Sequence, residues 1–94
     1  MNTTHMPLSF SLGQTVITRN ASETLDPDDV SAALLRHAAR DWGTLGTEDW
    51  KSNDDALKTG CRVLSAYQDG NGVKFWIITE WDRSVTTVLL PEDY

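Results

Sequence analysis

Cysteine is the scarcest reactive residue in this 94-residue sequence, which contains only Cys61. One cysteine cannot form an intramolecular disulfide or supply a cysteine-based metal site. Histidine is almost as rare, since His5 and His37 are its two occurrences and His5 lies in the N-terminal stretch. The sequence therefore predicts no metal and no cofactor, and its low cysteine content fits a reducing, cytoplasmic setting.

Long hydrophobic runs are absent as well. No apolar stretch approaches the roughly 18 residues that a membrane span needs. Residues 1–7 are polar without a basic start, which is unlike a signal peptide. The sequence also lacks a glycine-rich phosphate loop and a serine nucleophile elbow. We therefore expect a cytoplasmic, non-enzymatic protein with no catalytic residues and no contact with membranes.

Basic residues are few and unevenly placed. The chain has 14 acids and 8 bases, a net charge of −6. Between Asn20 and Asp55 nine acids stand against three bases, a net −6, so the rest of the chain is neutral. Phosphate contact requires a basic footprint, and an acidic surface instead attracts basic protein surfaces. Direct nucleic-acid binding is therefore not expected.

The first half of the sequence predicts a tail, a strand and a helix. Residues 1–9 read as a flexible N-terminal tail, and residues 10–94 as one domain. The β-branched residues of Leu12–Thr18 favour a strand. Asp26 and Pro27 suit the N-cap and first position of a helix that continues to about Arg40. Gly43 is expected to take the positive φ of its cap.

The second half predicts another helix and three strands. Thr47 is the expected N-cap of a helix that Gly60 closes. Strands are expected at Cys61–Tyr67, Val73–Trp81 and Val85–Leu90, joined by tight turns. The predicted fold is α+β in the order β-α-α-β-β-β, with two helices packed on one face of an antiparallel sheet.

Few polar residues are candidates for catalysis or for binding a ligand. Helical spacing places His37 at the border of the apolar stripe, where a packed or hydrogen-bonded histidine is expected rather than a general base. Asn53 interrupts an apolar helix face, and we expect its amide to tie the helix to a strand edge or to the loop at Trp42, with a role in a binding site as the alternative. Cys61 is expected to be a small packed thiol.

The last hairpin carries a further polar group. Glu80 and Asp82 are expected on one face of their strand, near Arg83 and Thr86. Such a group could form an acid/base pair, but a hairpin salt bridge with a turn cap is the commoner arrangement. An enzyme that uses Glu80, Asp82 and His37 is the least favoured interpretation.

Two surfaces are candidates for binding a partner. The two helices are expected to direct acids outward, at positions Asp28, Asp29, Asp41, Glu48, Asp49, Asp54 and Asp55. An ordinary solvated surface would look the same. If helices cover one face of the sheet only, one or two large aromatics, Trp76 and Trp81, must lie on the open face. There they could bind a partner, or be covered by the N-terminal tail or a second copy.

Several stretches are similar to a known group of proteins. They are residues 41–43, 60–67, 76–80 and 82–84, together with the ending at residues 86–94. From about Leu12 to Tyr94 the sequence resembles small proteins encoded on bacterial plasmids and integrated elements. The resemblance supplies no catalytic residues. It implies a setting, mobile DNA, in which small acidic proteins such as anti-CRISPR and anti-restriction proteins block host defence nucleases.

Two functions from different classes follow. The first is an inhibitor of a host defence complex, CRISPR-Cas or restriction, whose acidic helical face occupies a basic groove on its target. The second is a small homodimeric regulatory or antitoxin-like module that binds protein through an aromatic patch on the sheet. Both need a protein partner, and neither needs a cofactor.

Overall fold

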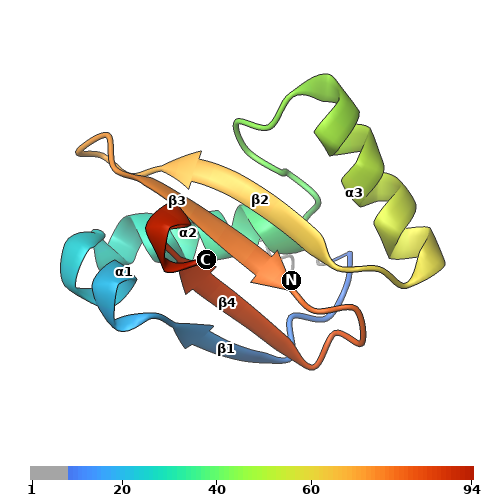
Figure 1. Cartoon of the computed structure of the whole chain (residues 1–94), viewed down its shortest axis with the longest axis horizontal. Coiled ribbons are helices and arrows are strands. Elements are labelled where there is room, and N and C mark those ends of the chain that lie inside the picture. Colours follow the sequence, from blue (N-terminus) through green and yellow to red (C-terminus); the bar gives the residue numbers. More distant parts are fainter. Residues whose placement is uncertain (1–8) are drawn as a thin grey trace, which may run out of the picture.

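The computed structural model describes residues 9–94 as a four-stranded sheet with helices behind it and beside it (Figure 1). The elements are β1 (Gln14–Ile17), α1 (Arg19–Thr24), α2 (Pro27–Ala38), α3 (Thr47–Thr59), β2 (Val63–Gln68), β3 (Lys74–Thr79), β4 (Val85–Leu89) and the 3-10 helix η1 (Pro91–Asp93). The α+β class is confirmed. No helix within residues 9–94 is long and apolar enough to cross a membrane. The expected tail lies outside this range except for Ser9, whose N–H donates to the Ala38 carbonyl at 2.8 Å.

The sheet is mixed, whereas the sequence predicted antiparallel pairing throughout. Its strand order is β1-β4-β3-β2, and the meander β2-β3-β4 is antiparallel as expected. β1, however, pairs parallel to β4, with Gln14 opposite Val85 and Ile17 opposite Val88. Tight turns impose antiparallel pairing on the meander, but β1 reaches its partner only after all three helices. No turn between β1 and β4 therefore fixes the relative direction of the two strands.

Helix α1 is an addition to the predicted elements. The expected first strand ends early, because Thr18 is the N-cap of this helix and its hydroxyl accepts from the Ala21 N–H. Ala21 and Leu25 then reach the core. The start of α2 is as predicted, with the Asp26 carboxylate accepting from the Asp28 N–H at 2.9 Å and Pro27 at the first position.

Two predicted helix boundaries differ in detail. The positive φ that follows the end of α2 is at Arg40 (69°), and the Asp41 N–H closes that end on the Arg36 carbonyl; Gly43 also has a positive φ (79°), as expected, but it lies further along the connection and does not cap the helix. Gly46, not Thr47, is the N-cap of α3. Gly60 ends α3 in the left-handed conformation, as expected.

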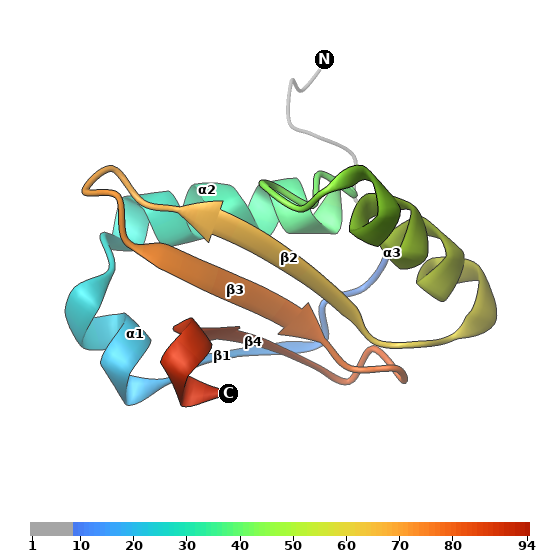
Figure 2. The same cartoon turned by 45° about the horizontal axis from the view of Figure 1, so that its top comes forward.

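The core lies on one side of the sheet. Alternation directs Phe75, Ile77 and Val88 toward α2, which meets them with Val30 and Ala33. α3 instead lies beside β2, the edge strand (Figure 2).

Beneath α3 a second, smaller cluster joins Trp42, Ala56 and Val63. The fully buried Trp42 therefore links the α2–α3 connection to the core. Among residues 9–94 the opposite sheet face carries no α-helix, and only the 3-10 helix η1 lies in front of it (Figure 1).

Candidate functional site

A chain of buried hydrogen bonds runs through the helical side of the sheet. The Thr86 hydroxyl donates to the Leu12 carbonyl at 2.7 Å, so its oxygen accepts from Thr79, also at 2.7 Å. Because the Thr79 hydroxyl already donates its proton to Thr86, its oxygen accepts from Nε2–H of His37 at 2.9 Å. Nδ1 of His37 then accepts from the Ser65 hydroxyl. His37 is therefore neutral and protonated at Nε2.

The buried histidine is structural. Its ring, like the hydroxyl-bearing residues Ser65, Thr79 and Thr86, is fully buried, so no substrate in solution can reach it. Burial, with a smaller effect of the Arg83 charge, lowers the pKa of His37 to about 4. The expectation of a packed or hydrogen-bonded histidine is confirmed, but the residue lies in the core rather than at its border.

Asn53 closes the edge of the sheet. Its Nδ2 donates to the Leu64 carbonyl at 2.7 Å, and its Oδ1 accepts from the Leu64 N–H at 3.2 Å. Beside it the Ala66 N–H donates to the Trp42 carbonyl, and the Thr44 N–H to the Ala66 carbonyl. The expected tie to a strand edge is confirmed. These bonds occupy the outer groups of β2 that another strand would use.

The last hairpin contains the expected turn cap without the expected salt bridge. Asp82 accepts from the Ser84 N–H and hydroxyl, at 3.1 and 2.6 Å, and these bonds lower its pKa. Arg83 donates to the carbonyls of Glu80 and Ala56 instead, and it forms no ion pair within the part of the chain that the structure describes. The side chains of Asp82 and Arg83 therefore stabilise the turn.

Cys61 is exposed, and the expectation of a packed thiol is wrong. β2 begins only at Val63, so Cys61 lies in the connection after α3 and is not carried into the sheet. Over residues 9–94 no three histidine, cysteine or acidic side chains are grouped so that they could hold a metal ion.

Two of the seven candidate acids are engaged in ion pairs. Arg36 donates to both carboxylate oxygens of Asp41, at 2.8 and 3.2 Å. The Asp54 carboxylate accepts from Trp42 Nε1 and from Arg40, each at 3.1 Å. Hydrogen bonds, chiefly from Arg36 and Trp42 respectively, lower the pKa of both acids. Both carboxylates thus fasten the α2–α3 connection.

The other five acids lie at two ends of the molecule. Asp28 and Asp29 begin α2, where the Asp29 carboxylate accepts from the Gly70 N–H of the β2–β3 turn at 2.7 Å. At the opposite end α3 carries the exposed acids Glu48, Asp49 and Asp55 (Figure 1). Lys51 and Lys58 are exposed on the same helix. The structure therefore does not join the seven acids into one continuous face.

The open face of the sheet is largely apolar. The side chains of β2, β3 and β4 on this side are Leu64, Ala66, Trp76, Ile78, Thr87 and Leu89, of which Ile78 and Leu89 are buried and the other four half-buried. Trp76 is half-buried and meets the Tyr94 ring edge-on at 5.8 Å, while Arg62 donates to the Tyr94 hydroxyl at 2.8 Å. Trp76 therefore lies on the open face, as one of the two expected aromatics.

Trp81 is the second candidate aromatic, and it lies outside the strands. β3 ends at Thr79, so Trp81 falls in the turn that follows and is 65% exposed. It is available to a partner, but alternation along β3 does not place it on the sheet.

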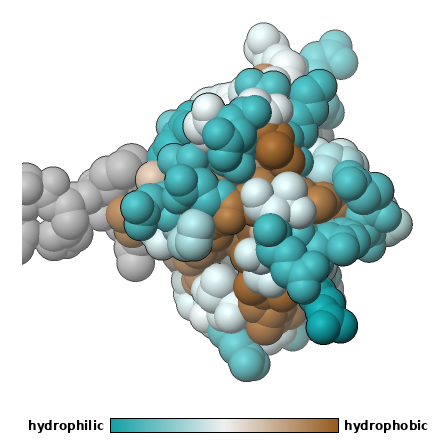
Figure 3. All heavy atoms as spheres, turned by 90° about the vertical axis from the view of Figure 1, so that its left-hand side faces the viewer, coloured by the Kyte–Doolittle hydropathy of each residue, from teal (hydrophilic) through white to brown (hydrophobic). Residues whose placement is uncertain are grey.

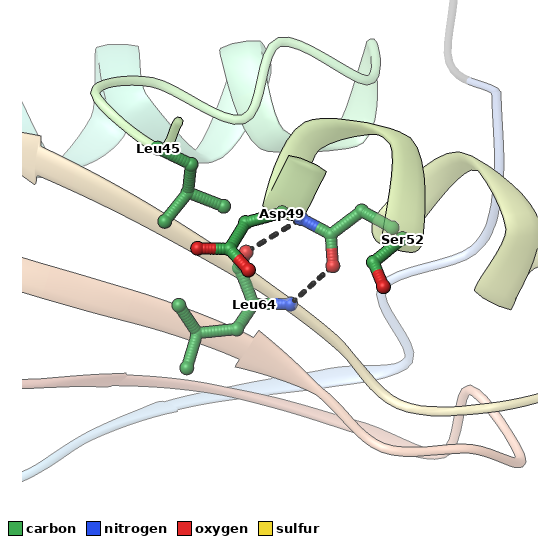
Figure 4. Close-up of a pocket in the computed structure, with 5 residues that line it drawn as sticks. Leu45, Asp49, Ser52 and Leu64 are labelled. Carbon is green, nitrogen blue, oxygen red and sulfur yellow. Dashed lines mark hydrogen bonds between the residues drawn. The ribbon is translucent and has the colours of Figure 1, made fainter. Parts of the chain in front are cut away.

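Two surface grooves accompany these features. One of about 270 Å³ lies between α3 and β2, where its lining includes Leu45, Asp49, Ser52, Asn53 and Leu64 (Figure 4). The other, about 260 Å³, lies beside α1 and the start of α2, and its lining includes Ile17, Leu25, Pro27 and Val30. Hydrophobic surface between hydrophilic residues marks the end of the molecule that carries α1 (Figure 3).

Sequence reasoning identified Asp49 but not the leucines of the first groove. Leu45 precedes α3, and Leu64 has the open-face parity of β2. Period-two alternation could have placed Leu64 on that face, but only the docking of α3 against the β2 edge brings the two leucines together with Asp49. The groove thus lies where α3 meets the open face of the sheet.

Comparison of the chain with protein-family models, with curated proteins and with solved structures found no match.

Proposed function

We propose that this chain is a non-enzymatic interaction protein that binds another protein through the open face of its sheet. The observation that carries the proposal is that the side chains of that face are mainly apolar, although within residues 9–94 no α-helix covers it and only the short η1 lies in front of it. Exposed apolar patches with polar rims are typical of protein-binding surfaces. Trp76 and Tyr94 supply the aromatic groups that dominate many such interfaces.

The proposed partner is a host defence nuclease complex, of the CRISPR-Cas or restriction type. The resemblance of residues 12–94 to proteins of mobile elements, which rests on the sequence stretches named above, supports this class of partner, and the net charge of −6 favours a protein target over a nucleic acid. A non-enzymatic role is supported by the burial of His37 and by the use of Asp82 in a turn.

The test introduces a charge on the open face, once on the inner strand β4 and once on the edge strand β2. Thr87→Arg and Ala66→Arg each place a guanidinium there, and Ala32→Arg makes the same charge change on the exposed side of α2. DNA cleavage by purified CRISPR effectors and restriction nucleases is measured with each variant present, after circular dichroism has confirmed folding. We expect inhibition by the parent chain and by Ala32→Arg, and its loss in both open-face variants. Equal inhibition by all four proteins would contradict the proposal.

A second candidate is binding through α3 alone. Its supporting observation is that Glu48, Asp49 and Asp55 are exposed and form no ion pair among residues 9–94. Their carboxylates could mimic phosphates in a basic groove of the nuclease. In the same cleavage assay Glu48→Gln with Asp55→Asn would then abolish inhibition, and Thr87→Arg would leave it intact.

A further inference from the structure

The groove between α3 and β2 combines two kinds of surface. Its walls are the aliphatic side chains of Leu45 and Leu64, and the Asp49 carboxylate lies between them (Figure 4). Ser52 adds an exposed hydroxyl one turn along the helix. An apolar slot with a carboxylate at its mouth matches a side chain that has an aliphatic stem and a cationic head.

We propose that this groove receives one basic side chain, arginine or lysine, of the protein partner. The stem would lie against Leu45 and Leu64, while the head would bond to the Asp49 carboxylate and the Ser52 hydroxyl. The inference rests on the proposed function, because Leu64 belongs to the open face, and it specifies the chemistry of the partner at the border of that face.

Charge complementarity selects this occupant. Asp49 is in no ion pair or side-chain hydrogen bond within residues 9–94, whereas Asp41 and Asp54 are each neutralised by an arginine. An apolar side chain would cover the carboxylate without pairing it, which costs free energy, and an acidic one would be repelled. Asn53 also lines the groove, but its amide is already bonded to the Leu64 backbone.

A tripeptide tests the groove without the unidentified partner. The ¹⁵N-labelled full chain is titrated with Gly-Arg-Gly and with Gly-citrulline-Gly, which has nearly the same shape without the charge, and amide shifts are followed by NMR. We expect saturable shifts at Asp49, Ser52 and Leu64 with a Kd on the order of millimolar for the arginine peptide only.

Two substitutions that each remove one negative charge from α3 distinguish binding in the groove from general electrostatic attraction to the helix. Asp49→Asn should raise the Kd of Gly-Arg-Gly about tenfold, as expected for loss of a charge-assisted hydrogen bond. Asp55→Asn removes the same charge from the same helix outside the groove lining, and should change the Kd less than about twofold. Equal effects of the two variants, or equal binding of the citrulline peptide, would overturn the inference.

Failure of this inference and failure of the proposed function give different results. If Gly-Arg-Gly fails to bind while Thr87→Arg still abolishes nuclease inhibition, the groove inference fails and the open-face interface stands. If the peptide binds but no nuclease is inhibited, the groove takes basic side chains and the proposed partner is wrong.

Discussion

His37 organises the polar interior on the helical side of the sheet. Its two ring nitrogens connect Ser65 on β2 with Thr79 on β3, and the Thr79–Thr86 bond continues to β4 and to the segment before β1. Phe10 and Trp42 pack on the ring edge-to-face, at centroid distances of 5.5 and 5.4 Å. Every member of the network is paired, which is the condition under which buried polar groups specify a core rather than weaken it.

The burial of His37 predicts loss of stability between about pH 6.5 and pH 4. The unfolded histidine has a pKa of 6.5, and the folded one titrates at about 4. Over this interval the unfolded chain binds the extra proton, so the free energy of unfolding falls as the pH falls, by about 3 kcal/mol in total. Urea unfolding at half-unit pH steps measures this decrease.

The carboxylates do not account for this window. Hydrogen bonds lower the pKa of Asp41, Asp54 and Asp93 from 3.8, so their stabilisation is present above that value and is lost only as the pH falls below it. In His37→Gln the slope between pH 6.5 and 4 should therefore shrink. An unchanged slope in this variant would show that another group titrates there.

At the scale of elements, the β2 edge shows how the sheet is terminated. Exposed edges invite pairing with other chains. Here the Asn53 amide and the Trp42–Thr44 segment bond to the outer groups of Leu64 and Ala66. α3 therefore acts as a cover for the edge.

Removing the amide of Asn53 should be costly. Asn53→Ala leaves the Leu64 N–H and carbonyl without their partner at a half-buried position, and we expect the free energy of unfolding to fall by about 1–3 kcal/mol. Ser52→Ala, one residue away and exposed, should change it by less than about 0.5 kcal/mol. Chemical denaturation of both variants makes the comparison. Similar stabilities would mean that water replaces the amide without loss.

Gly43 and Gly60 form a second matched pair. Both have positive φ, 79° and 76°, but a Cβ at Gly43 would lie 1.8 Å from the Ala66 carbonyl oxygen, whereas one at Gly60 meets open space. Gly60→Ala should cost about 1 kcal/mol for the left-handed conformation alone. Gly43→Ala must also displace the connection from β2, and we expect it to cost more than about 3 kcal/mol. Thermal unfolding distinguishes them, and equal costs would refute the close approach at Gly43.

Elements set by local chemistry were predictable from the sequence. The Asp26-Pro27 start of α2, the Gly60 end of α3 and the turns of the meander depend on neighbouring residues, and each is found. The parallel pairing of β1 was not predictable, because Gln14 and Val85 meet across most of the chain and no turn relates them. Cys61 was misplaced for a related reason, since the first residue of a strand depends on where its partner ends.

The candidate site was predictable only in part. The sequence identified Asp49 and Trp76 by charge and alternation. It could not show that Arg36 and Arg40 neutralise Asp41 and Asp54, because both ion pairs depend on how the chain turns after α2. The separation of the remaining acids to two ends is likewise a property of the tertiary fold.

At the scale of the whole molecule, the open face is apolar but not unprotected. Ile78 and Leu89 at its centre are only 4% and 5% exposed, because β3 contacts η1 and the Tyr94 ring packs on Trp76. The unbound chain thus already buries the two aliphatic side chains whose exposure would be most unfavourable. What remains available is the rim of this face and its aromatic surface.

This partial cover predicts a monomer in solution. A stable homodimer would have to bury a large, well-packed area, and two chains that each carry a net charge of −6 repel one another. We expect light scattering at about 50 μM to give the mass of one 10.5 kDa chain, with no change in Thr87→Arg. A dimer that Thr87→Arg dissociates would mean that a second copy occupies the open face, which would favour the homodimeric module over an inhibitor that uses this face. A dimer that survives the substitution would place the contact elsewhere, and the exposed edge of β1 would then be the first surface to substitute.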